Sequence, residues 1–122
     1  MSEVVTPAQI EKRLYDLSKL IDEAHNDLVD AEGAYHHNKA YYEVAMANSR
    51  MGLAQISSPT GRNYTVAERE DIALLDNKEA HKALADAEAM VKANRANVAR
   101  LRVQVDIARS IGTSVRTGMD AS

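Results

Sequence analysis

Apolar residues recur along the chain in alternating steps of four and three, and we call these positions the seam. The first part of the seam comprises Ile10, Leu14, Leu17, Ile21, Ala24, Leu28, Ala31, Tyr35, Asn38, Tyr42 and Ala45. The second part comprises Ala80, Leu84, Ala87, Val91, Asn94, Val98, Leu101, Val105 and Ala108. A repeat of this kind is typical of helices that pack one narrow stripe against a neighbour. The pattern therefore predicts two long amphipathic helices.

Start and stop signals set the expected bounds of these helices. The sequence Thr6-Pro7-Ala8-Gln9 reads as a capping box with proline at the first helical position, which predicts a helix over about 7–55. Ser, Pro, Gly and Asn cluster at 56–64, which predicts a loop. Thr65 and Glu68 form a second capping box, so a second helix is expected over about 66–110. Gly112 and Gly118 predict a flexible tail over 111–122.

The composition favours the same architecture. The 122 residues include no Cys, Trp or Phe, and only five Gly and two Pro. So few turn residues argue against a β protein, and the absence of Cys excludes disulfides and cysteine zinc sites. A short loop between long helices makes them antiparallel neighbours. We therefore expect an all-α fold with one domain over 1–122, a long, coiled-coil-like antiparallel helical hairpin.

Self-association is predicted by a second apolar row beside the seam. This row contains Leu20, Ala34 and Tyr41 in the first helix and Ala83, Met90 and Ile111 in the second. A two-helix hairpin covers only a narrow stripe, so the wider face predicts a homo-oligomer. The expected interface comprises Leu20, Tyr41, Met90 and Ile111, together with the polar seam residues Asn38 and Asn94. A seam Asn fixes register or oligomeric state.

An arginine ladder is the first candidate for binding chemistry. It comprises Arg95, Arg102, Arg109 and Arg116, which recur every seven residues, with Lys92 and Arg100 nearby. One interpretation is salt bridging to the first helix. Pairing positions around the loop midpoint places Arg109 opposite Glu11, but Arg102 opposite Ser18 and Arg95 opposite His25. The other interpretation is a stripe that follows a phosphate backbone.

A second candidate lies near the loop. Tyr rings stack on unpaired bases, and Lys and Arg bind phosphates. The surface candidates here are Lys39, Tyr41, Arg50, Arg62 and Tyr64, accompanied by His36 and His37. Tyr35 and Tyr42 occupy seam positions and are expected in the core. The same composition also suits an ordinary soluble surface, so both interpretations stay open.

Catalysis and metal binding find little support in the sequence. His36 and His37 are adjacent, so on a helix they diverge by about 100° and do not easily chelate one ion. The acidic stretch at 20–34 contains Asp22, Glu23, Asp27, Asp30 and Glu32, and is interpreted as a solvated face or a dock for a basic partner. No nucleophile motif, phosphate loop or metal signature occurs. We expect no catalytic residue, no metal and no cofactor.

Segments 11–17, 40–45 and 101–110 resemble a family of small helical phage proteins, and the overall layout is similar to phage recombination mediators of the UvsY type. The resemblance implies a homo-oligomer that binds single-stranded DNA and helps load a recombinase onto DNA coated by single-strand-binding protein. The net charge of −3 departs from a strongly basic DNA binder. The competing hypothesis is a structural or adaptor coiled coil that binds only protein, in virion assembly or host takeover.

The sequence also indicates where such a protein works. It contains neither an apolar run long enough to cross a membrane nor a leader-like N-terminus. We therefore expect no membrane partner and a cytoplasmic location, in the host cell if the protein is phage-encoded.

Overall fold

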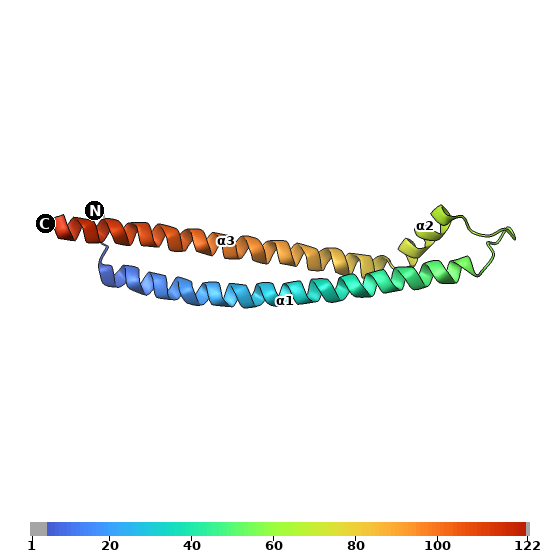
Figure 1. The fold of residues 1–122 in the computed structure, drawn as a ribbon, viewed down its shortest axis with the longest axis horizontal. Coiled ribbons are helices and arrows are strands. Elements are labelled where there is room, and N and C mark those ends of the chain that lie inside the picture. The colour runs from blue at the N-terminus through green and yellow to red at the C-terminus, as the bar shows by residue number, and fades with distance from the viewer. Residues whose placement is uncertain (1–4, 122) are drawn as a thin grey trace. The chain divides into compact units, whose positions relative to one another are not determined.

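The chain forms three helices in the computed structural model, which describes the backbone of residues 5–121 and the side chains of residues 5–119 (Figure 1). These are α1 (Pro7–Ala54), α2 (Val66–Asp76) and α3 (Lys78–Ala121). Between the helices, the described residues show an isolated β-bridge that joins Ser57 and Asn63, and no strand. The predicted all-α class is therefore confirmed.

Two compact units divide the chain. Met1–Val29 and Lys92–Ser122 form one, which we call the terminal unit, and Asp30–Val91 form the other, which we call the loop unit. In each unit a part of α1 packs antiparallel to a part of α3. In the terminal unit Ile10 contacts Gly112 and His25 contacts Arg102, and in the loop unit the rings of Tyr42 and His81 meet edge to face.

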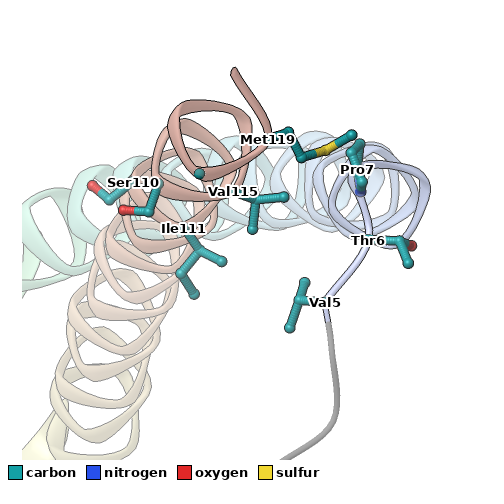
Figure 2. Close-up of a pocket in the computed structure, with 9 residues that line it drawn as sticks. Val5, Thr6, Pro7, Ser110, Ile111, Val115 and Met119 are labelled. Atoms are coloured by element: carbon teal, nitrogen blue, oxygen red, sulfur yellow. The ribbon is translucent and has the colours of Figure 1, made fainter. Parts of the chain in front are cut away.

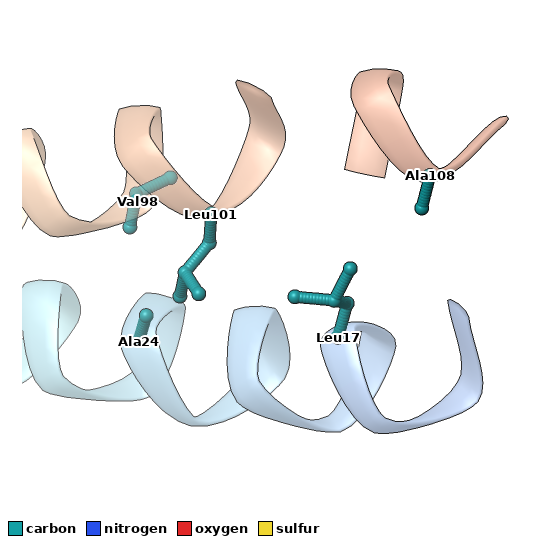
Figure 3. Close-up of a cluster of buried hydrophobic side chains, with 5 residues drawn as sticks. All are labelled: Leu17, Ala24, Val98, Leu101 and Ala108. Atoms are coloured by element: carbon teal, nitrogen blue, oxygen red, sulfur yellow. The ribbon is translucent and has the colours of Figure 1, made fainter. Parts of the chain in front are cut away.

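The seam supplies the core of the terminal unit. Its buried cluster comprises Leu17, Ala24, Val98, Leu101 and Ala108, which lie between the two helices in Figure 3. Ile10, near the start of α1, is buried as well. Leu14, Ile21, Leu28 and Val105 pack against this cluster and are half-buried. Because the core is one residue wide, both flanks of the helix pair stay open to solvent.

The start of α1 follows the predicted capping box. The Thr6 hydroxyl accepts from the Gln9 backbone N–H at 3.2 Å, and the Gln9 side-chain oxygen accepts from the Thr6 N–H at 2.9 Å. These bonds satisfy two donors that a helix N-terminus otherwise leaves unpaired. The helix begins at Pro7 as expected and ends at Ala54, one residue from the expected position.

The second predicted helix is interrupted, which corrects the expectation of one continuous helix over 66–110. The break falls at Asn77, which ends α2 and precedes α3. Its side-chain amide donates to the Ala73 carbonyl and to the Ser49 hydroxyl, both at 2.8 Å. The break needs neither glycine nor proline, since the bond from Asn77 to Ser49 of α1 stabilises it. The sequence therefore carries no local signal for it.

The expected flexible tail over 111–122 is also corrected, because α3 continues to Ala121. Gly112 is buried against α1, and a Cβ at this position would lie 3.1 Å from Cγ2 of Ile10. The glycine therefore allows close approach of the two helices. The sequence pattern predicts a helix end at this glycine, because its packing against α1 depends on a helix that is distant in the sequence.

Leu17→Ala is expected to destabilise the protein by about 2–5 kcal/mol, because Leu17 is fully buried between the two helices. Urea unfolding followed by far-UV circular dichroism measures the change. Val29→Ala serves as the control, since Val29 is 66% exposed on the same helix and should change stability by less than about 0.5 kcal/mol. Equal effects of the two substitutions would show that the seam is not the core.

Candidate nucleic-acid interface

The arginine ladder lies on α3 within the terminal unit. Arg95, Arg102 and Arg109 directly follow seam residues, and Arg116 lies one further heptad along α3, so all four occupy the same flank of the helix pair, and all four are exposed. We call this side the arginine flank. The seam packs α3 against α1, and the seven-residue repeat within α3 sets the spacing of the arginines.

Three of the arginines are not neutralised by acids of the described part of the chain. Among the described residues, Arg102, Arg109 and Arg116 form no ion pair with a carboxylate. Arg102 donates from Nη2 to Nε2 of the half-buried His25 at 3.4 Å, and Arg116 donates from Nε to the Gly112 carbonyl at 3.4 Å. Since a guanidinium only donates, the His25 nitrogen is the acceptor in this contact.

The predicted register agrees with the structure near Glu11, but the contact that Arg102 makes differs from the predicted one by seven residues, or about two helical turns. Glu11 and Arg109 line the same small cavity, together with Arg116, although no ion pair joins Glu11 to either arginine. Arg102 reaches His25, whereas the sequence had placed it opposite Ser18. The interpretation of this end of the ladder as interhelical salt bridges therefore finds no support in these contacts.

The remaining cations of this region differ in placement. Arg95 and Lys92 take part in interactions within the chain. Arg100 donates to the Asn97 side chain at 2.8 Å and precedes a seam residue, so it lies on the other flank. The arginine flank of the terminal unit thus offers Arg102, Arg109 and Arg116 as its available cations.

Tyr15 is a candidate that the sequence interpretation missed. It lies one turn after Glu11 on α1, is 61% exposed, and its ring centroid lies 4.6 Å from the Lys19 ammonium nitrogen. Like most of the ladder arginines, Tyr15 directly follows a seam residue. In an antiparallel helix pair, the residues that directly follow seam residues lie on the same flank in both helices. Applying this rule to the sequence would have identified Tyr15.

The loop candidates lie in the loop unit and are partly neutralised. Arg50 binds Glu70 through two nitrogens, at 2.7 and 3.0 Å, and Arg62 approaches Glu68 at 3.6 Å. Bidentate pairing of this kind is among the stronger polar contacts of a protein surface. Tyr64 is half-buried, while Lys39 and Tyr41 are exposed. The structure does not bring these residues together with the ladder in one unit.

Polar seam residues and histidines complete the candidates. The Asn38 amide donates to the Ala34 carbonyl of its own helix at 2.8 Å, and both Asn38 and Asn94 are half-buried. Within residues 5–119, no group of three or more His, Asp or Glu side chains is arranged to hold a metal ion. None of the helices over the described residues is both long and apolar enough to cross a membrane.

Comparisons with known proteins give no relative for this arrangement. No protein-family model, no curated protein and no solved structure matches the chain. The argument for function therefore depends on the residues themselves.

The pKa of Glu68 provides a test of the local electrostatics at the start of α2. The hydrogen bonds from the Thr65 backbone N–H and hydroxyl are the largest causes that lower this pKa. The positive charge of Arg62 lowers it by a smaller amount. A lowered pKa in the folded chain means that the carboxylate stabilises α2 above its unfolded pKa and loses this effect as pH falls through the folded pKa. We expect a side-chain NMR titration to place this pKa below that of an ordinary glutamate.

In the same titration, Thr65→Ala should raise the pKa of Glu68 more than Arg62→Gln does, because alanine keeps the backbone N–H bond but removes the hydroxyl bond, which lowers this pKa more than the Arg62 charge does. A larger rise in Arg62→Gln would show that the ion pair, rather than the capping box, holds the carboxylate.

Proposed function

We propose that this protein binds single-stranded DNA without catalysis, through Arg102, Arg109 and Arg116. The observation that supports the proposal is that three exposed guanidinium groups share one flank and have no carboxylate partner among the described residues. An unneutralised row of cations attracts a polyanion, and each bound phosphate contributes free energy through counterion release.

The spacing and surroundings of the row suit an extended single strand. Seven residues of helix rise about 10.5 Å, so the charges follow a line along the helix. Tyr15 presents an aromatic ring on the same flank, and stacking on Tyr accepts any base. Binding of this kind depends on backbone charge and stacking, and it predicts little sequence preference.

The proposal extends to assembly and context. Leu20, Tyr41, Met90 and Ile111 are all exposed, which supports the expected homo-oligomer. With the resemblance to recombination mediators, we propose an accessory role in recombination, with a recombinase or a single-strand-binding protein as partner. Such a role needs no cofactor and takes place in the cytoplasm.

An adaptor that binds only protein is the second candidate. It is favoured by exposed apolar side chains in the loop unit, which include Val66 and Leu75 on α2 and Met51 near the end of α1. Apolar docking changes little with salt, whereas phosphate contacts weaken steeply as salt rises. The salt dependence of binding therefore separates the two candidates.

Arg102→Gln combined with Arg109→Gln is expected to weaken binding of a labelled single-stranded oligonucleotide, whatever its sequence. The slope of log affinity against log salt should fall in magnitude by roughly 0.7 for each phosphate that the variant no longer binds. Fluorescence anisotropy over a salt series measures both quantities. Helicity should stay unchanged, because Gln and Arg have similar helix propensities.

The matched control removes the same charge elsewhere, by Lys12→Gln combined with Lys82→Gln, and should leave the slope nearly unchanged. If both double variants reduce the slope equally, binding reflects net charge and the arginine flank has no special role. If the wild type binds no single-stranded DNA at all, the adaptor is the better hypothesis.

Self-association predicts that the thermal unfolding midpoint rises with protein concentration, because association stabilises the folded chain by mass action. Circular dichroism melts over a wide dilution series measure this shift. Leu20→Glu, Met90→Glu and Ile111→Glu together should reduce both the shift and the molar mass in solution while helicity persists. A midpoint that is independent of concentration would indicate a self-sufficient monomer.

A further inference from the structure

The flank opposite the arginines carries an exposed apolar ridge in the terminal unit. Val103, Ile107 and Ile111 are 56%, 54% and 44% exposed and follow one another at four-residue steps along α3. Residues four apart are neighbours on a helix surface, so the three side chains form one ridge. Leu20, on the same flank of α1, is 42% exposed. We call this surface the apolar flank.

The ridge continues into a groove at the end of the terminal unit. The groove has a volume of about 860 Å³ and is lined by Ile111 together with Val5, Pro7, Val115 and Met119. Figure 2 shows Ile111 and Val115 on α3 facing Val5 and Pro7 at the start of α1. Ile111 belongs to both features, so ridge and groove form one continuous apolar surface.

Charge is depleted from the ridge although α3 is a basic helix. Residues 91–119 contain six cations and one acid. At about 100° per residue, the positions of 91–119 that lie within about 60° of Ile107 are Lys92, Ala93, Ala96, Arg100, Val103, Gln104, Ser110, Ile111, Ser114 and Gly118. Lys92 and Arg100 are the charges among them, and both precede the ridge, whereas Arg102, Arg109 and Arg116 lie on the opposite side. Two copies of α3 can therefore approach each other along this face without bringing their arginine ladders together. A centre that is poor in charged residues is also typical of protein interfaces.

The apolar flank of α1 is complementary to itself. Arg13 and Asp16 lie one turn apart on the same flank as Leu20. Contacts of Ile10 with Gly112 and of Arg13 with Gln104 place Ile107 at about the level of these two residues. A two-fold axis at Ile107 therefore brings Arg13 of each copy opposite Asp16 of the other copy. The ion pair then occurs twice, as every contact in a two-fold symmetric interface does.

The surface is also large enough for a stable pair. The α1 part of the terminal unit is about 35 Å long, and two adjacent helices present a face about 20 Å wide. Such a face covers about 700 Å², which is close to the 800 Å² or so that each partner contributes to a standard interface.

We propose that a second copy of this chain covers the apolar flank of the terminal unit, with the two α3 helices antiparallel and crossing at Ile107. This inference rests on the self-association in the proposed function and names its surface. The ladders of both copies stay exposed on the outside of the pair. One dimer then offers two arginine flanks, which raises avidity for a strand long enough to reach both.

Single-cysteine variants test the geometry, because the chain has no cysteine of its own. Ile107→Cys should form a disulfide-linked dimer under mild oxidation at least about ten times faster than Asp106→Cys, since only sulfurs close to the axis meet the short Cα separation of a disulfide. Asp106 is the matched control, because it is exposed and adjacent but about 100° away around α3. Equal rates in a wild type that associates would overturn this interface and leave self-association standing.

Light scattering completes the test without DNA. Ile107→Glu should lower the molar mass to that of a monomer with unchanged circular dichroism, whereas Val29→Glu, at a position 66% exposed in the same unit, should not. If Ile107→Glu unfolds, the milder Ile107→Ser should still weaken association. A wild type that is monomeric at the highest concentration would overturn both the interface and the proposed self-association, while DNA binding by that monomer would leave the arginine flank intact.

Discussion

The packing of α1 on α3 along the seam is the interaction on which the other features of the terminal unit depend. Leu17 and Leu101 fill the space between the helices, and small residues such as Ala24, Ala108 and Gly112 let the backbones come close. A core of this width buries little apolar surface for each residue, and it leaves both flanks of the helix pair exposed. The chemistry of the protein is therefore carried by its flanks.

The two flanks of the terminal unit differ in character. One carries arginines that follow seam residues, and the other carries Val103, Ile107 and Ile111 with few charges. The difference is produced by one helix, because α3 presents cations on one side and apolar side chains on the other. Binding of a polyanion on one side and of a second copy on the other are then compatible, since neither ligand competes for the residues of the other.

The arginine flank also illustrates why paired and unpaired charges should be distinguished. Arg50 and Arg62 look as suitable for phosphate binding in the sequence as the ladder does, but Glu70 and Glu68 lie against them in the structure. A phosphate must then displace a carboxylate, which offsets part of the free energy of the new interaction. Arg102 contacts the His25 ring and pairs with no carboxylate of the described residues, so a phosphate there displaces none.

The sequence by itself determined the helical class, the seam, both capping boxes and the extent of α1, because these depend on periodicity and on bonds between residues three or four apart. It also placed the ladder on one flank. The break at Asn77 and the burial of Gly112 were decided by tertiary contacts with Ser49 and Ile10. Only the tertiary structure shows which arginines have no carboxylate partner among the described residues. A shift of one turn between antiparallel helices gives each residue a different partner across the seam.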